Sequence, residues 1–213
     1  FTQAFRYAYG PFVFGKNKDK NSKQMYADAM KYFFIFSMLA FLSVMFYMDF
    51  LKYLVASDYW EGLVVVAIVM GAEIFKGIYF NLSIWYKLTD ETRWGAYFSL
   101  IGCGVILALN IWLVPLYGYI ASAWASVAGY GVITLLSYWM GQKKYPVAYP
   151  LKSMTVYFLL AAVLFIVGYY IPISSLVLRL LWRTLLLCVF IAFVLKKDLP
   201  LKQLPFINRF VRK

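Results

Sequence analysis

Glu73 and Lys76 are two oppositely charged residues that lie three positions apart inside a long apolar stretch. This spacing places both side chains on one face of a helix. Charges in the middle of a membrane-spanning helix cost a few kcal/mol each, so we expect the pair to face a bundle interior or a wet cavity. Two interpretations stay open: the charges neutralise each other, or Glu73 binds a coupling proton or cation whose affinity Lys76 moderates. Asn81, farther along the same stretch, would extend the polar face.

Arg179 and Arg183, four positions apart near the start of the last apolar stretch, form a second candidate site. A guanidinium stays charged and offers a bidentate fork to phosphate, so the diphosphate of a substrate is a ligand that fits. Arg179 is close enough to the end of the stretch to extend its charge to the membrane surface, whereas Arg183 lies one turn deeper. Arg6, in the apolar opening segment, could have the same role. A purely structural role stays open for all three.

The composition excludes several other kinds of chemistry. Histidine is absent, which removes the commonest general base and the commonest metal ligand. The two cysteines, Cys103 and Cys188, lie in apolar runs and are expected to be packing residues. There is no glycine-rich Walker A loop, and the connections are too short for an active-site domain. The chain is therefore predicted not to be an enzyme and to need no cofactor or metal.

The same composition defines the class of protein. Hydrophobic residues occupy 64% of the 213 positions and charged residues only 14%, which excludes a soluble domain. The basic residues that give the net charge of +12 lie between apolar blocks and not along one polar face. They therefore predict orientation in a membrane and no binding of nucleic acid. Six blocks are each long enough to cross a bilayer. They are residues 31–51, 63–85, 95–117, 120–140, 154–173 and 176–195.

These blocks predict an all-α fold, a polytopic membrane bundle of six transmembrane helices over residues 31–195. Residues 1–15 are expected to be the end of a truncated span or an interfacial segment, residues 16–30 a basic cytoplasmic loop, and residues 196–213 a basic cytoplasmic tail. Sixteen lysines and arginines fall in alternate connections on one side, while Lys52 is alone on the other. Basic residues collect on the cytoplasmic side of membrane proteins, so both flanks are predicted to be cytoplasmic.

A helical hairpin is predicted between the third and fourth blocks. Pro115 and Gly118 make the connection so short that the two helices must be antiparallel neighbours. Ala121 and Ala123 begin a run of small residues, which allow helix backbones to approach closely in lipid. Asn110 can bond to a neighbouring helix or line a pathway; both roles stay open.

Three parts of the sequence resemble a known family. The opening AFRYAYGPFVF, the block NIWLVPLYGYIASAWAS at residues 110–126, and the loop ending in Tyr145 and Pro146 resemble polysaccharide flippases of the multidrug, oligosaccharidyl-lipid and polysaccharide exporter superfamily. Members have two six-helix lobes and two additional C-terminal helices. The resemblance implies that the six blocks here are the ninth to fourteenth spans, that residues 1–15 end the eighth, and that an N-terminal lobe belongs to the parent chain.

The resemblance also implies a function. It predicts the C-terminal part of a bacterial inner-membrane flippase that moves an undecaprenyl-diphosphate-linked oligosaccharide by alternating access, for O-antigen, capsule or lipopolysaccharide synthesis. The expected partners are the lipid-linked oligosaccharide, the missing N-terminal lobe and the glycan polymerase machinery. Two alternatives stay open: a cation-coupled drug or metabolite exporter of the same superfamily, and a noncatalytic membrane scaffold subunit. The family defines no substrate-binding residues that transfer to this sequence.

Overall fold

The computed structural model describes residues 22–171 and 173–198, and within them every regular element is a helix. Six helical segments of this part of the chain are long and apolar enough to cross a membrane, which confirms the predicted all-α class and indicates a membrane protein. The elements are α2 (Ser22–Phe46), α3 (Met48–Leu51), η1 (Lys52–Leu54), η2 (Ser57–Val65), α4 (Val66–Leu82), α5 (Ile84–Leu88), α6 (Arg93–Tyr117), α7 (Tyr119–Lys144), α8 (Leu151–Tyr170) and α9 (Leu176–Lys197).

Two boundaries differ from the sequence prediction. Residues 22–30, expected in a basic loop, are instead the first turns of α2. Tyr26, Ala27 and Met30 on this part of the helix are buried, and these apolar contacts favour helix over loop. The second block is broken into η2, α4 and α5, and the last break lies at Ser83, whose hydroxyl donates to the Phe80 carbonyl oxygen at 2.6 Å.

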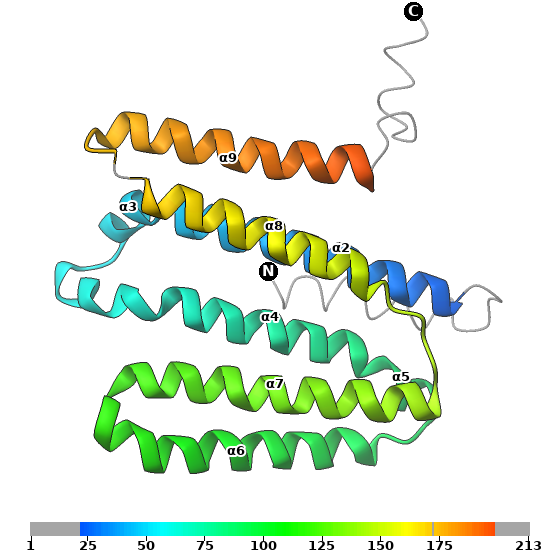
Figure 1. Cartoon of the computed structure of the whole chain (residues 1–213). Coiled ribbons are helices and arrows are strands. Elements are labelled where there is room, and N and C mark those ends of the chain that lie inside the picture. The colour runs from blue at the N-terminus through cyan, green and yellow to red at the C-terminus, as the bar shows by residue number, and fades with distance from the viewer. Residues whose placement is uncertain (1–21, 172, 199–213) are drawn as a thin grey trace, which may run out of the picture. The chain divides into compact units, whose positions relative to one another are not determined.

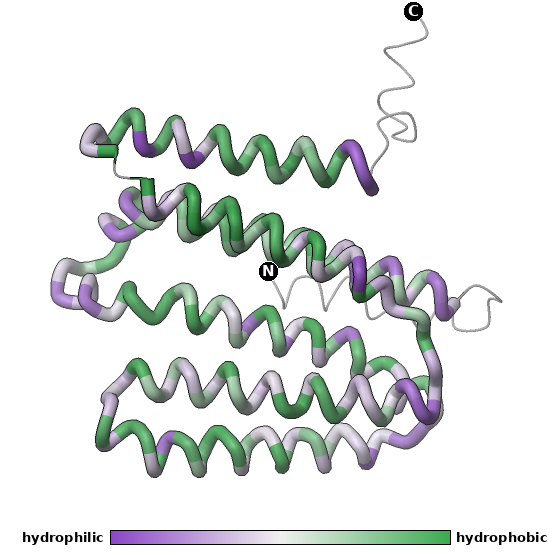
Figure 2. The backbone as a smooth tube through the Cα atoms, in the orientation of Figure 1, coloured by the Kyte–Doolittle hydropathy of each residue, from purple (hydrophilic) through white to green (hydrophobic). Residues whose placement is uncertain are grey.

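The chain divides into two compact units, described separately here. The first unit joins the N-terminal part of α2, as far as Ser37, to residues 58–151. The second unit joins residues 38–57 to the chain from Lys152 onward. Along the helices of both units the tube in Figure 2 is mostly hydrophobic, and hydrophilic colour appears mainly near helix ends.

In the first unit, α7 lies between α4 and α6 (Figure 1). The hydroxyl of Thr134 in α7 donates to the Phe75 carbonyl oxygen of α4 at 3.0 Å. Toward the two ends of α7, the Tyr119 hydroxyl donates to the Glu61 carbonyl oxygen of η2, and Trp85 of α5 packs on Gly141. Since the contacts advance together along both segments, α4 and α7 run parallel, while α6 runs antiparallel to α7.

Gly118 alone connects α6 to α7, with φ +63° and ψ −150°. Positive φ is a conformation that glycine adopts without a steric penalty, which explains the residue type at this link. Pro115 lies inside the last turn of α6 and not in the connection where the sequence placed it. The side-chain amide of Asn110 donates to the Ile106 carbonyl oxygen of its own helix at 2.7 Å.

Two glycines, Gly102 of α6 and Gly129 of α7, form the close contact between the two arms of this hairpin. Ala121 and Ala123 of α7 are buried, as is Gly129 further along the helix. A Cβ atom at Gly129 would lie 2.3 Å from Cγ1 of Ile106 and 3.3 Å from the carbonyl oxygen of Gly102. No side chain fits there without displacing a neighbour, so α6 and α7 depend on glycine at this crossing.

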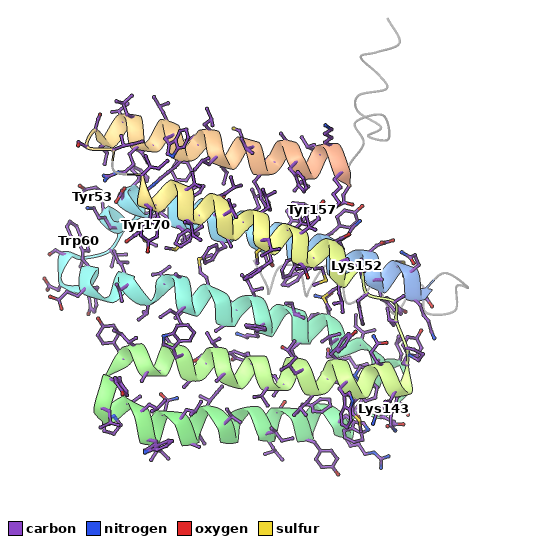
Figure 3. All side chains as sticks on the ribbon, viewed as in Figure 1. Tyr53, Trp60, Lys143, Lys152, Tyr157 and Tyr170 are labelled. Atoms are coloured by element: carbon purple, nitrogen blue, oxygen red, sulfur yellow. The ribbon has the colours of Figure 1, made fainter. Side chains whose placement is uncertain are left out.

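Basic residues gather at one end of the first unit. The Lys144 ammonium donates to Oε1 of Glu91 at 2.7 Å, and the indole of Trp94 donates to Oε2 at the same distance. At this end the Lys23 ammonium lies 4.6 Å from the centre of the Tyr145 ring. Figure 3 labels Lys143 at this end of the unit and Trp60 at the opposite end. Aromatic residues thus lie at both ends of the unit and basic residues gather at one of them, which is the distribution expected of a membrane-spanning unit.

The Glu91 carboxylate gives this end a pH dependence that can be measured. The hydrogen bond from Lys144, and after it the one from Trp94, lowers the pKa of Glu91. A carboxyl with a lowered folded-state pKa stabilises the fold above its unfolded pKa, and this contribution is lost as the pH falls through the folded value. Glu91→Gln is therefore expected to unfold with a weaker dependence on pH in the acidic range. The measurement is thermal unfolding in detergent between about pH 7 and about pH 3.

The exposed neighbour Asp90 offers the matched control, because asparagine tolerates its positive φ of 57°. Asp90→Asn is expected to keep the pH dependence of the original protein. The assignment to Glu91 would be wrong if both variants had the same acid profile.

The second unit consists of the C-terminal part of α2, the short helices after it, α8 and α9. Gly168 of α8 fits against Phe46 and Leu186, whose side-chain atoms would meet an added Cβ at 2.7 and 3.2 Å. The rings of Phe41 and Phe165 pack edge to face, with centroids 5.5 Å apart. Figure 3 shows Lys152 at the opposite end of this unit from Tyr53 and Tyr170.

Candidate functional site

The Glu73 and Lys76 side chains form an ion pair on one face of α4. The Lys76 ammonium lies 2.9 Å from Oε1 of Glu73, as their spacing predicts. The same ammonium lies 5.6 Å from the centre of the Tyr130 ring of α7. The two side chains keep 47% and 43% of their surface exposed, so the neighbouring helices of the first unit cover only about half of the pair.

The half-exposed position of this pair limits what can surround it. Glu73 lies near the middle of α4, between Val66 and Leu82, far from either end of the apolar stretch. Hydrocarbon around this face would leave two charges poorly solvated, even when they compensate each other. The exposed side of the pair therefore requires water, a polar ligand or polar groups of another protein segment.

Asn81 does not continue this exposed face. It is buried, and its amide nitrogen donates to the Gly77 carbonyl oxygen at 3.0 Å. The amide oxygen has no hydrogen-bond partner among the residues that the structure describes. The exposed polar face of α4 is thus confined to Glu73 and Lys76.

Arg183 is held inside the second unit by three hydrogen bonds. Nη1 donates to Oδ2 of Asp49 at 2.9 Å and to the Phe46 carbonyl oxygen at 3.1 Å, while Nε donates to the Gly168 carbonyl oxygen at 3.2 Å. Only 7% of the residue is exposed. The guanidinium therefore joins α9 to α8 and to the corner formed by α2 and α3.

Arg179 approaches the same carboxylate but is bound less fully. Its Nε lies 3.1 Å from Oδ2 of Asp49, close enough for an ion pair, yet the N–H does not point along a hydrogen bond. The side chain is 32% exposed. One carboxylate thus faces two guanidinium groups, and the cluster formed by Asp49, Arg179 and Arg183 carries one excess positive charge.

Asp49 is the residue that sequence reasoning missed. It is separated from Arg183 by 134 positions, so no local spacing connects the two residues. A signal was nevertheless present, because Asp49 ends the first apolar block on the side where the last block begins with its two arginines. The hydroxyls of Tyr47 and Thr184 form a second bond across the same contact at 2.7 Å.

The candidate residues thus fall into separate groups. The Glu73 and Lys76 pair belongs to the first unit and the arginine cluster to the second. Arg6 lies outside the described residues. Among residues 22–171 and 173–198, no three Cys, Asp or Glu side chains are grouped so that they could hold a metal ion.

What these groups can do follows from charge. The α4 pair offers a carboxylate to a proton or cation, and the arginine cluster offers a guanidinium to an anion. Comparison of the chain with protein-family models, with curated proteins and with solved structures finds no match.

Proposed function

We propose that this chain is the C-terminal part of a bacterial inner-membrane flippase that moves an undecaprenyl-diphosphate-linked oligosaccharide to the outer leaflet. The sugar and diphosphate cross through a cavity between two lobes by alternating access, while the lipid tail stays among acyl chains. Six membrane-crossing helices and the resemblance of residues 110–126 to polysaccharide flippases support this function.

The Glu73 and Lys76 ion pair is the observation that carries the proposal. A half-exposed pair in the middle of a spanning helix needs polar surroundings, and a hydrated translocation pathway supplies them. In this proposal Glu73 binds the coupling proton or cation, and Lys76 competes with that ion for the carboxylate. Binding and release at Glu73 would then favour different conformations of the transporter.

The proposed orientation places the basic end of the first unit, with Lys144 and Lys23, in the cytoplasm. Lys196 and Lys197 at the end of α9 belong to the same side in this arrangement, so the carboxyl terminus is cytoplasmic. The cationic residues Arg179 and Arg183 then lie toward the outer leaflet.

The test is transport by the full-length protein in vesicles that carry a labelled undecaprenyl-diphosphate oligosaccharide in the inner leaflet. Arrival of the sugar at the outer surface is measured with an external glycosidase. Glu73→Gln is expected to lower the initial rate about tenfold, which corresponds to about 1.4 kcal/mol in the activation barrier. Glu61→Gln is the matched control, because this exposed carboxylate lies in η2, and its rate should equal that of the original protein.

Different results would support different functions. Equal rates for both variants and the original protein would remove Glu73 from the mechanism. Uptake of small organic cations without movement of the lipid-linked sugar would replace the proposal with a cation-coupled exporter. Transport of neither substrate would favour a scaffold subunit.

A further inference from the structure

One end of the second unit carries an excess of positive charge. The cluster formed by Asp49, Arg179 and Arg183 at this end contains two cations and one anion. On the proposed orientation this end faces the outer leaflet, where basic residues are otherwise scarce. The cluster therefore keeps one excess positive charge, which a negatively charged ligand would balance.

Arg183 is not the residue that meets such a ligand. Its guanidinium is buried and already donates to Asp49 and to the carbonyl oxygens of Phe46 and Gly168. Releasing it would leave these acceptors unpaired inside the unit. Arg183 fixes the corner of the unit and contributes its charge from within.

Arg179 has the opposite character. Its Nε faces Asp49 at 3.1 Å, and this atom makes no hydrogen bond within the described residues. A third of the Arg179 side chain is exposed, against 8% for Arg183. The Asp49 carboxylate attracts the guanidinium without accepting a hydrogen bond from its Nε, so the guanidinium keeps donors that an anion could use.

The depth of Arg179 identifies the kind of anion. Arg179 lies three residues after the start of α9, about 4.5 Å along the helix axis. At the same end of the unit, Tyr53 and Tyr170 leave 67% and 78% of their surface exposed (Figure 3). Exposed tyrosines at the end of a spanning helix lie at the level of lipid headgroups. The guanidinium of Arg179 therefore reaches the layer that contains lipid phosphates.

We propose that Arg179 binds the phosphate of a lipid headgroup at the outer end of α9. Asp49 keeps the guanidinium close by charge attraction, and the buried Arg183 supplies the positive charge that one carboxylate cannot neutralise. The site is separate from the Glu73 and Lys76 pair, and its occupation does not depend on transport. The phosphate comes either from a bilayer phospholipid or from a polyprenyl carrier, since both present it at this depth.

The test is lipid binding to the purified full-length protein in detergent, measured by native mass spectrometry. The two probes are a short-chain phosphatidylglycerol and undecaprenyl phosphate, titrated separately. Arg179→Gln is expected to weaken binding about fivefold, as removal of one cation from an anionic lipid contact does. Lys143→Gln, an exposed cation of the first unit, is the control and should bind as the original protein does.

Weaker binding of both probes would support a general lipid-phosphate site, and weaker binding of undecaprenyl phosphate alone would identify the carrier as the occupant. Unchanged binding of both probes by Arg179→Gln would overturn the proposal, as would an equal loss in Lys143→Gln. Arg179→Lys keeps the charge next to Asp49 but lacks the fork, so it should bind with intermediate affinity and gives a second folded variant. Because binding is measured without transport, failure here is distinct from failure of the flippase proposal.

Discussion

Replacing Arg183 with alanine is expected to lower the free energy of unfolding by about 3 kcal/mol, near the lower end of the cost of breaking a buried ion pair. The substitution removes three hydrogen bonds and leaves the Asp49 carboxylate and two carbonyl oxygens without their donor. The carbonyl oxygens of Phe46 and Gly168 belong to α2 and α8, so the corner of the second unit loses the group that joins its helices. The partly exposed Asp49 carboxylate keeps some solvation, which places the cost at the lower end.

The measurement is reversible denaturation in mild detergent, followed by tryptophan fluorescence. Arg179→Ala is the matched control, because it removes a guanidinium from the same carboxylate at a partly exposed position, where ion pairs contribute about 1 kcal/mol or less. In the double variant Arg183→Ala with Asp49→Ala the loss should be smaller than the sum of the two single losses. Equal destabilisation by Arg183→Ala and Arg179→Ala would contradict the assignment of Arg183 as the buried residue that joins the helices of the second unit.

Gly129→Val is expected to lower the free energy of unfolding by about 2 kcal/mol through overpacking of the contact between α6 and α7. The new Cβ would overlap the Ile106 side chain. It would also press against the carbonyl oxygen of Gly102, a backbone atom that cannot rotate away as a side chain can. The helices would have to separate, which costs packing contacts over the length of the hairpin.

Gly131→Val is the control for this substitution. Gly131 lies in the same helix and changes helix propensity equally, but an added Cβ there meets nothing within 4 Å. The same denaturation experiment should give nearly the stability of the original protein. Ile106→Ala should restore part of the stability of Gly129→Val, because it removes the side chain nearest to the added methyl groups. Equal losses for Gly129→Val and Gly131→Val would mean that the hairpin contact is looser than described.

The number and class of the helices could be predicted because length and hydrophobicity are local properties of the chain. The contact between Glu73 and Lys76 could be predicted for the same reason, since it depends on one helix. The start of α2 could not be placed, because Lys23 and Gln24 are exposed on its first turn and hide the helical spacing of Tyr26 and Met30. The polar and charged residues of this segment have the composition of a loop, although the apolar residues between them are spaced as in a helix.

The partner of Arg183 could not be predicted because it depends on tertiary packing. The sequence identifies a costly charge in an apolar block, and burial requires that such a charge be paired. It does not identify Asp49, since that choice depends on which helix ends meet in the second unit. The position of Pro115 was also assigned incorrectly. Proline removes one helix hydrogen bond and crowds the carbonyl group of the preceding turn, but only two residues of α6 follow Pro115, so the helix continues to Tyr117.

The one-residue link at Gly118 restricts how this protein can change shape. Two helices of 25 and 26 residues that share a single connecting glycine and touch at Gly129 cannot splay apart without tearing their contact. In the proposed transport cycle α6 and α7 are therefore expected to move together, and with them α4, to which Thr134 of α7 is bonded. Residues 146–150, which follow α7 and form no helix, are fixed to the same unit, because Val147 is buried and its carbonyl oxygen accepts a hydrogen bond from Gln142 at 2.8 Å. Any change of shape in the cycle is then expected outside this compact group of helices.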